Sequence, residues 1–161
     1  MRVRLITSAS ALALMLGAQA AMADGHGGPL KVGVLATLEG TYTTLGEDGV
    51  RGLRTALAQA GNKAGAREVE LVIQSTDTSP DSAVRGARKL VEQDGVEIVL
   101  GPLSGSEGIA IRDYSKTQPG VTFINGISGA METTYVTPSE NFFRFNTDGA
   151  QWSVGLGDYV F

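Results

Sequence analysis

The sequence contains no cysteine and a single histidine, His26, among its 161 residues. Without cysteine it can form no disulfide bond and no thiolate metal site, and one histidine cannot supply a zinc cluster. Carboxylates such as Asp77 and Asp81 are more simply explained as loop and helix-capping residues. We therefore expect no metal site and a fold that is stabilised by its hydrophobic core.

Basic residues are outnumbered by acidic ones, with 13 lysines and arginines against 17 aspartates and glutamates and a net charge of −4 at pH 7. No basic cluster with interleaved aromatic residues is present, which argues against a nucleic-acid partner. The sequence also lacks G-x-G-x-x-G after its first predicted strand, and it has no G-x-x-x-x-G-K-[ST]. We therefore expect no nucleotide or other cofactor.

A catalytic serine is the next possibility, because "GISGA" (126–130) is a near match to the nucleophile elbow of serine hydrolases, with Ser128 at the turn. A serine nucleophile needs a histidine as general base. His26 lies in a glycine-rich stretch near the amino terminus, far from this motif in the sequence. No triad can be assembled, so we expect a protein that is not an enzyme.

The amino terminus has the three parts of a secretory signal in residues 1–23. Arg2 and Arg4 form the charged start, Leu5 to Gly17 the apolar stretch, and Ala21 to Ala23 the cleavage site. The mature protein has no cysteine to accept a lipid, and no second apolar span follows. These features predict a protein of the periplasm that is not a lipoprotein, with a flexible leader over residues 24–29 and no insertion into the membrane after cleavage.

Short apolar runs alternate with amphipathic stretches along the rest of the chain, which predicts an α/β fold. The expected strands are Leu30–Thr37, Val69–Thr76, Val96–Gly101 and Val121–Asn125, and the expected helices are Gly46–Gly61, Ser79–Gly95 and Ser106–Lys116. Strand and helix at this spacing make right-handed crossovers, so the strands should form a layered parallel sheet with helices on both faces.

The pattern changes after Asn125, where a loop-like stretch is followed by an extended run, Asn141–Thr147. A final helix is predicted from Gly149, with apolar residues at helical spacing up to Val160. The sequence ends inside this helix, and we therefore expect it to be an amino-terminal fragment.

Three loops follow strands of the predicted sheet at its carboxyl edge, where α/β proteins bind small molecules. They are "LEGTYTTLG" (38–46), "PLSGSEG" (102–108) and "GISGAMETT" (126–134). In the second loop, Gly105 allows a ligand close to the backbone, and the serines beside it offer hydroxyl groups next to a helix amino terminus. Such a turn suits a carboxylate, although Ser104 or Ser106 could equally serve only as the helix cap.

Four blocks of sequence together resemble the amino-terminal lobe of the branched-chain amino-acid class of periplasmic binding proteins, the receptors of ABC importers. They are "LKVGVLATLEGTYTTLGEDGVRGLRTALAQAG", "VELVIQSTDTSPDSAVRGARKLV", "DGVEIVLGPLSGSEGIAIRDYS" and "VTFINGISGA". The resemblance implies flavodoxin-like winding in a ligand-binding lobe over residues 30–140. It also implies a crossing strand over 141–148 and, from 149 to 161, the start of a second lobe that is largely missing.

The same resemblance implies a site. The loops after the third and fourth strands would offer hydroxyl and N–H groups to a ligand carboxylate, and the loop after the first strand would form an apolar wall. The matching positions are Tyr42, Leu45, Ser104, Gly105, Ser106, Ile127, Ser128 and Gly129. "NGISGA" lacks the proline that is usual there in amino-acid binders, which disfavours an α-amino acid among the possible ligands.

The function that the resemblance implies is capture of a small carboxylate-bearing molecule, such as an amino acid, an amide or an aromatic acid. The two lobes would close over it by a hinge, and an ABC permease would recognise the closed form. The alternative is a ligand-sensing domain of a signalling receptor or an amide-responsive regulator.

Overall fold

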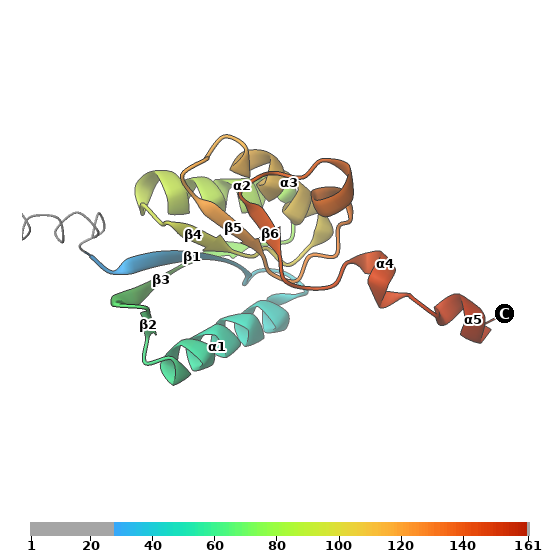
Figure 1. Ribbon diagram of the computed structural model, residues 1–161, viewed down its shortest axis with the longest axis horizontal. Coiled ribbons are helices and arrows are strands. Elements are labelled where there is room, and N and C mark those ends of the chain that lie inside the picture. The colour runs from blue at the N-terminus through green and yellow to red at the C-terminus, as the bar shows by residue number, and fades with distance from the viewer. Residues whose placement is uncertain (1–27, 161) are drawn as a thin grey trace, which may run out of the picture.

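The computed structural model describes residues 28–160, which form a six-stranded sheet with the strand order β2-β3-β1-β4-β5-β6 (Figure 1). The strands are β1 (Leu30–Thr37), β2 (Lys63–Ala64), β3 (Arg67–Thr76), β4 (Ile98–Leu100), β5 (Thr122–Asn125) and β6 (Phe142–Arg144). All pairings are parallel except that of β2, which joins the edge antiparallel to β3. Apart from β2 this is the flavodoxin-like order, so the predicted α/β fold is confirmed.

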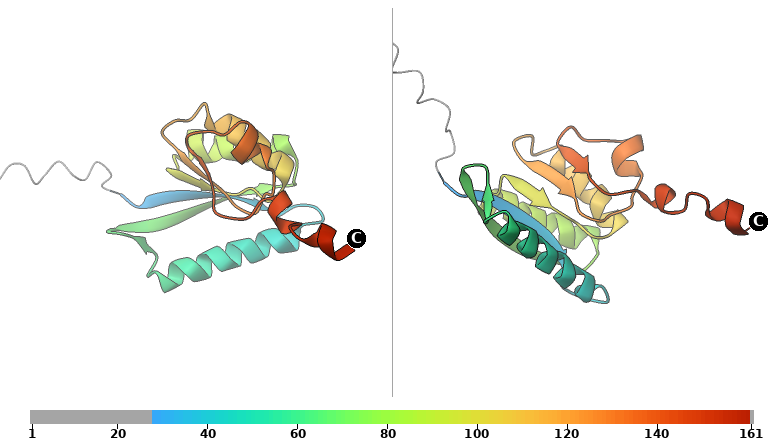
Figure 2. Two further views of the ribbon diagram at one scale, coloured as in Figure 1. Left: turned by 45° about the vertical axis from the view of Figure 1, so that its right-hand side comes forward. Right: turned by 60° about the horizontal axis from the view of Figure 1, so that its bottom comes forward.

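The helices lie on both faces of the sheet, as the continuous apolar strands predicted. Helix α1 (Thr43–Gln59) covers one face, and α2 (Pro80–Arg88) and α3 (Gly105–Ser115) cover the other (Figures 1 and 2). Neighbouring side chains of β1 point to opposite faces, so Leu35 joins the core under α2 and α3 while Val34 packs near α1. The core on the α2 and α3 side is the larger, with Leu90, Val99 and Phe123 fully buried.

Local capping explains where α2 and α3 begin. The Ser79 hydroxyl accepts a hydrogen bond from the N–H of Ser82, and Pro80 occupies the first helical position. Ser104 and Glu107 form a reciprocal capping box at the start of α3. Both starts lie within one residue of the predicted ones.

The structure corrects several predicted elements. A short hairpin precedes β3, because Asn62 and Gly65 both have positive φ angles (56° and 62°) that turn the chain between α1 and β3. Helix α2 continues into a π-helical turn, η1 (Lys89–Gln93), and a second such turn, η2 (Glu132–Val136), lies in the stretch that the sequence predicted to be a loop.

The carboxyl-terminal helix is divided in two, in place of the single helix that the spacing predicted. Helix α4 (Gly149–Trp152) and α5 (Leu156–Val160) are separated by Gly155, whose φ of 82° is incompatible with a continuous helix. Both extend away from the sheet (Figures 1 and 2). The extended run 141–147 forms β6 only over Phe142–Arg144, where it pairs with β5.

The predicted signal, residues 1–23, and most of the predicted leader lie outside the described residues. Within residues 28–160, no helix is both long enough and apolar enough to cross a membrane.

Candidate functional site

The carboxyl ends of β1, β4 and β5 meet at one edge of the sheet, because these strands are parallel and in register. Val34 pairs with Leu100, and Leu100 with Ile124. The three loops predicted from the sequence therefore emerge side by side at this edge (Figure 2). The first is shorter than predicted, because α1 begins at Thr43 and places Leu45 in its first turn. We call this edge, with its loops, the binding edge.

The loops after β4 and β5 are in direct contact. The N–H of Ile127 donates to the carbonyl of Pro102 at 3.4 Å. A Cβ on Gly126 would lie 3.0 Å from both the Gly101 Cα and the Pro102 carbonyl oxygen, so this glycine is required by the close approach. The two predicted loops thus form one surface.

The first serine of "SGS" has a structural role as the cap of α3. The Ser104 hydroxyl accepts from the N–H of Glu107 at 3.3 Å and donates to the carbonyl of Thr78 at 3.1 Å. The fully buried Glu107 accepts the N–H of Ser104 in return, at 3.0 Å. Its carboxylate partly offsets the positive end of the helix, which weakens this end as an anion site.

Gly105 and Ser106 offer the donors that remain at this helix end. Their N–H groups are in the first turn of α3, where no helical carbonyl is available to accept them. Ser106 is exposed, and its hydroxyl lies 3.4 Å from that of Ser104. Gly105 lies beside the loop after β5, with Ala130 3.5 Å from the position of a Cβ.

Ser128 is buried, with 1% of its surface exposed, and its hydroxyl lies against Gly108 of α3. In this arrangement the hydroxyl accepts the N–H of Ala130 at 3.5 Å and is not presented at the binding edge. A ligand contact of the Ser128 side chain stays a prediction. Ile127 and Gly129 on either side of it are more exposed.

An apolar groove of about 600 Å³ opens between α1 and the ends of β1, β4 and β5. Two of the predicted wall and loop residues, Leu45 and Ile127, line it from opposite sides, and Phe145 joins them. Tyr42 is half exposed and lies outside the lining. Asp48 is the charged residue of the lining, and it is paired with Arg51. The groove can therefore accommodate an apolar group, and its lining extends to Leu103, two residues before α3 begins.

Arg144, whose side chain binds the loop that contains Ile127 to Gly129, was not among the residues predicted from the sequence. It donates to the carbonyl of Ser128 at 2.6 Å and to that of Ala130 at 2.6 Å. Asn125 and Asn146 donate to the same Ser128 carbonyl. A lone arginine in "NFFRFNT" has no local signal of this role, because its acceptors lie 14 and 16 residues away.

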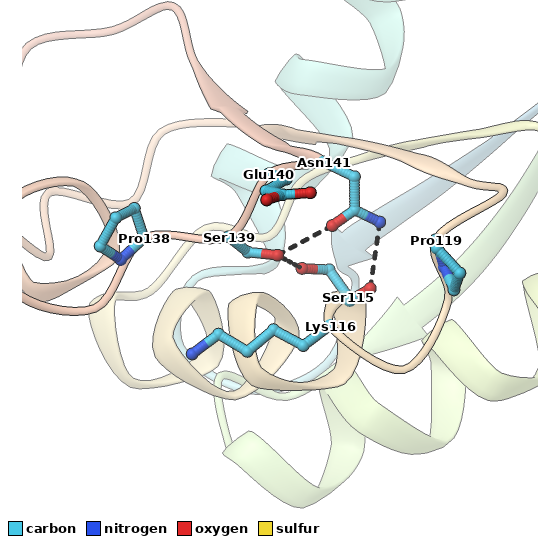
Figure 3. Close-up of a pocket in the computed structure, with 7 residues that line it drawn as sticks. All are labelled: Ser115, Lys116, Pro119, Pro138, Ser139, Glu140 and Asn141. Carbon is cyan, nitrogen blue, oxygen red and sulfur yellow. Dashed lines mark hydrogen bonds between the residues drawn. The ribbon is translucent and has the colours of Figure 1, made fainter.

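A second hollow, of about 510 Å³, lies where α3 ends and β6 begins (Figure 3). The Asn141 amide donates to three backbone carbonyls there, those of Ser115, Gln118 and Val121, and the Ser115 hydroxyl donates to that of Ser139. These polar groups are already hydrogen-bonded to one another. They connect the end of α3 to the start of β6 and leave few groups for a ligand. Within residues 28–160, no group of three or more His, Cys, Asp or Glu is placed to hold a metal ion.

The family profile described as "Periplasmic binding protein" matches residues 29–161, nearly all of the described fold. The chain belongs to the periplasmic binding protein family. The resemblance inferred from the four sequence blocks is thereby confirmed. The Leu/Ile/Val-binding protein homolog 3 of Brucella melitensis is 27% identical over 163 residues, which cover 99% of this chain and 42% of that protein.

Solved structures agree with this assignment. An ABC transporter substrate-binding protein from Sphaerobacter thermophilus is 34% identical and superposes with a TM-score of 0.74, over 81% of this chain and 36% of that one. A solute-binding protein of an ABC transporter from R. palustris, in complex with benzoate, is 28% identical with a TM-score of 0.72, over 77% and 34%. The two solved proteins are named as substrate- or solute-binding proteins of ABC transporters, and the Brucella protein as a homolog of Leu/Ile/Val-binding proteins. This chain spans less than half of each.

Proposed function

We propose that the chain forms one wall of the ligand cleft of an extracytoplasmic receptor for an ABC importer. The ligand class that we propose is a small carboxylate with an apolar or aromatic body. The observation that supports this most directly is that the apolar groove, with Leu45 and Ile127 in its lining, extends to Leu103, two residues before Gly105 and the unpaired N–H groups at the start of α3. The N–H groups would receive the carboxylate and the groove would receive the body.

An aromatic acid fits this edge better than an α-amino acid does. An ammonium group needs an acidic partner, but Asp48, the acidic residue of the groove lining, is paired with Arg51, and Glu107 is buried in the helix cap. The relative that was solved with benzoate is consistent with this choice. The remaining parts of the proposal are suggested by the family. Hinge closure and delivery to a membrane permease also depend on a second lobe, and a periplasmic location depends on the predicted signal.

Titration of the ¹⁵N-labelled chain with benzoate, followed by NMR, tests the ligand class. We expect the amide signals of Gly105, Ser106 and Gly129 to shift, with an affinity in the millimolar range because a single wall leaves the ligand open to water. Benzamide, which has the same shape without the charge, is the matched control and should shift them less. The proposal is wrong if benzoate leaves these three signals unchanged, or if benzamide shifts them equally.

A further inference from the structure

Arg144 is the last residue of β6 and pairs with Asn125 of β5, so its side chain starts next to the loop that leaves β5. Besides the carbonyls of Ser128 and Ala130, it donates to two hydroxyls of the same loop, that of Thr133 at 2.8 Å and that of Thr134 at 2.9 Å. Its three nitrogens thus bind four points on one short stretch of chain. Only a planar guanidinium can reach all of them at once.

Further bonds fasten the same loop to the residues that follow β6. The N–H of Gly149 donates to the carbonyl of Gly129 at 2.9 Å, and the Tyr135 hydroxyl donates to the buried carboxylate of Asp148 at 2.8 Å. The N–H of Gln151 holds the pKa of the Asp148 carboxyl below its usual value, so this acceptor stays charged. The loop 126–136 and the segment 144–149 are therefore one hydrogen-bonded unit.

The position of Ile127 and Gly129 at the binding edge depends on this unit. Ile127 lines the groove, and Gly129 packs against Trp152, whose ring lies 2.6 Å from the position of a Cβ. The backbone between them contributes the Ser128 carbonyl, which is the point where Arg144, Asn125 and Asn146 converge. Loss of the arginine would release the middle of the loop while leaving the sheet pairing of β6 in place.

We propose that Arg144 is a positioning residue for the ligand, which holds the Ile127–Gly129 turn in its binding geometry and ties it to the strand that leaves the sheet. This inference rests on the proposed function. Arg144 acts through the loop, because the four bonds to loop oxygens already occupy its side chain. Movement of residues 144–149 would be transmitted to the turn by the same bonds.

Arg112 of α3 is a control, because it also donates several bonds to this connection; it is buried, whereas Arg144 is half-buried. Its Nη1 binds the carbonyl of Glu132 at 3.0 Å and that of Thr137 at 2.5 Å. It therefore holds the far end of the loop, away from Ile127 and Gly129. Arg112→Lys should disturb the fold at least as much as Arg144→Lys, because Arg112 is the more buried of the two, but it should leave the turn in place.

The first measurement is hydrogen exchange on the full chain without ligand. Arg144→Lys should raise the exchange rates of the amides in residues 127–130 by about tenfold or more, whereas Arg112→Lys should raise those of 132–137. Asn146→Ala, which removes a single bond to the Ser128 carbonyl, should give a smaller increase in 127–130 and remains available if Arg144→Lys does not fold. Unchanged exchange in 127–130 in the variants would overturn the proposal.

The second measurement is the NMR titration with benzoate. Arg144→Lys should weaken the affinity by about tenfold, since misplaced contact groups lose binding steeply, and Arg112→Lys should leave it near that of the wild type. Equal effects of the two substitutions would show a general structural role and overturn the inference. If benzoate does not bind the wild type, the proposed function fails, and the exchange rates alone decide the role of Arg144.

Discussion

Ser104 lies in a predicted binding motif but also has a structural role, as the cap of a helix. Its hydroxyl caps α3 and also reaches the carbonyl of Thr78, and its N–H binds Glu107. Ser104 is therefore the cap of α3, and a contact between Ser104 and a ligand stays a prediction, because a cap and a ligand contact can coexist. Its neighbour Ser106 remains exposed and stays a predicted ligand residue.

A single residue, Tyr114, should make the free energy of unfolding depend on pH in the alkaline range. Burial against Phe123, followed by the carboxylate of Glu92, raises the pKa of Tyr114 from 10.0 to about 12. The unfolded chain loses this proton first, so the stabilisation is complete below pH 10 and is lost as the pH rises towards about 12. Urea unfolding at a series of alkaline pH values should show this loss in the wild type.

Tyr114→Phe should remove this part of the alkaline destabilisation, and Glu92→Gln should reduce it without abolishing it, because burial is the larger cause. A Phe variant whose free energy of unfolding falls as steeply as that of the wild type in this pH range would contradict the assignment.

At the scale of elements, the contact between α1 and β1 depends on one glycine. A Cβ on Gly46 would lie 2.6 Å from the carbonyl carbon of Thr37, so α1 can approach the end of β1 only because this side chain is absent. Gly49, one turn further along α1, has nothing within 4 Å of the equivalent position. An added methyl group would therefore collide with the backbone at Gly46 but would fit at Gly49.

Gly46→Ala should lower the free energy of unfolding by about 1–3 kcal/mol, because backbone atoms cannot yield to the added methyl group. Gly49→Ala should raise it by about 0.5–1 kcal/mol, through the better helix propensity of alanine. Chemical denaturation of both variants measures the difference. Equal effects would mean that α1 can shift along the sheet at no cost.

At the scale of the whole molecule, the described chain is a folded lobe with a short carboxyl-terminal extension. Large apolar side chains from Val154 to Val160 are exposed, with 89% of Tyr159 accessible. By contrast, α4 is joined to the lobe by Gly149 and by the cap of Asp148. The boundary of the folded unit therefore lies after Ser153.

Ending the chain after Ser153 should change the free energy of unfolding by less than about 0.5 kcal/mol, because the removed side chains are exposed. Ending it after Asp148 should cost about 1–3 kcal/mol, since the carbonyl of Gly129 and the carboxylate of Asp148 would lose backbone donors. Thermal unfolding of the two truncated chains compares them directly. A large loss in the longer one would show that α5 contributes to the lobe.

Much of the fold was predictable, because its signals are local. The strand Leu30–Thr37 was predicted with the bounds that β1 has, and Ser79 caps α2 as its sequence pattern indicated. The hairpin of β2 was missed because two residues, Lys63 and Ala64, are too few for a periodic pattern. The break at Gly155 was missed because apolar spacing does not report a positive φ angle.

The winding of the sheet was implied by the family resemblance, whereas the sequence by itself determined the order of the main elements and the edge at which the loops meet. These follow from hydrophobic period, helix caps and the handedness of crossovers, which act within a few residues or apply to every such chain. Only the tertiary structure decided which polar groups of those loops are available and that Arg144 holds them. The pairing of β6 with β5 brings Arg144 close to its hydrogen-bond partners. Hydrogen bonds between residues this far apart in the chain produce no periodic pattern from which they could be predicted.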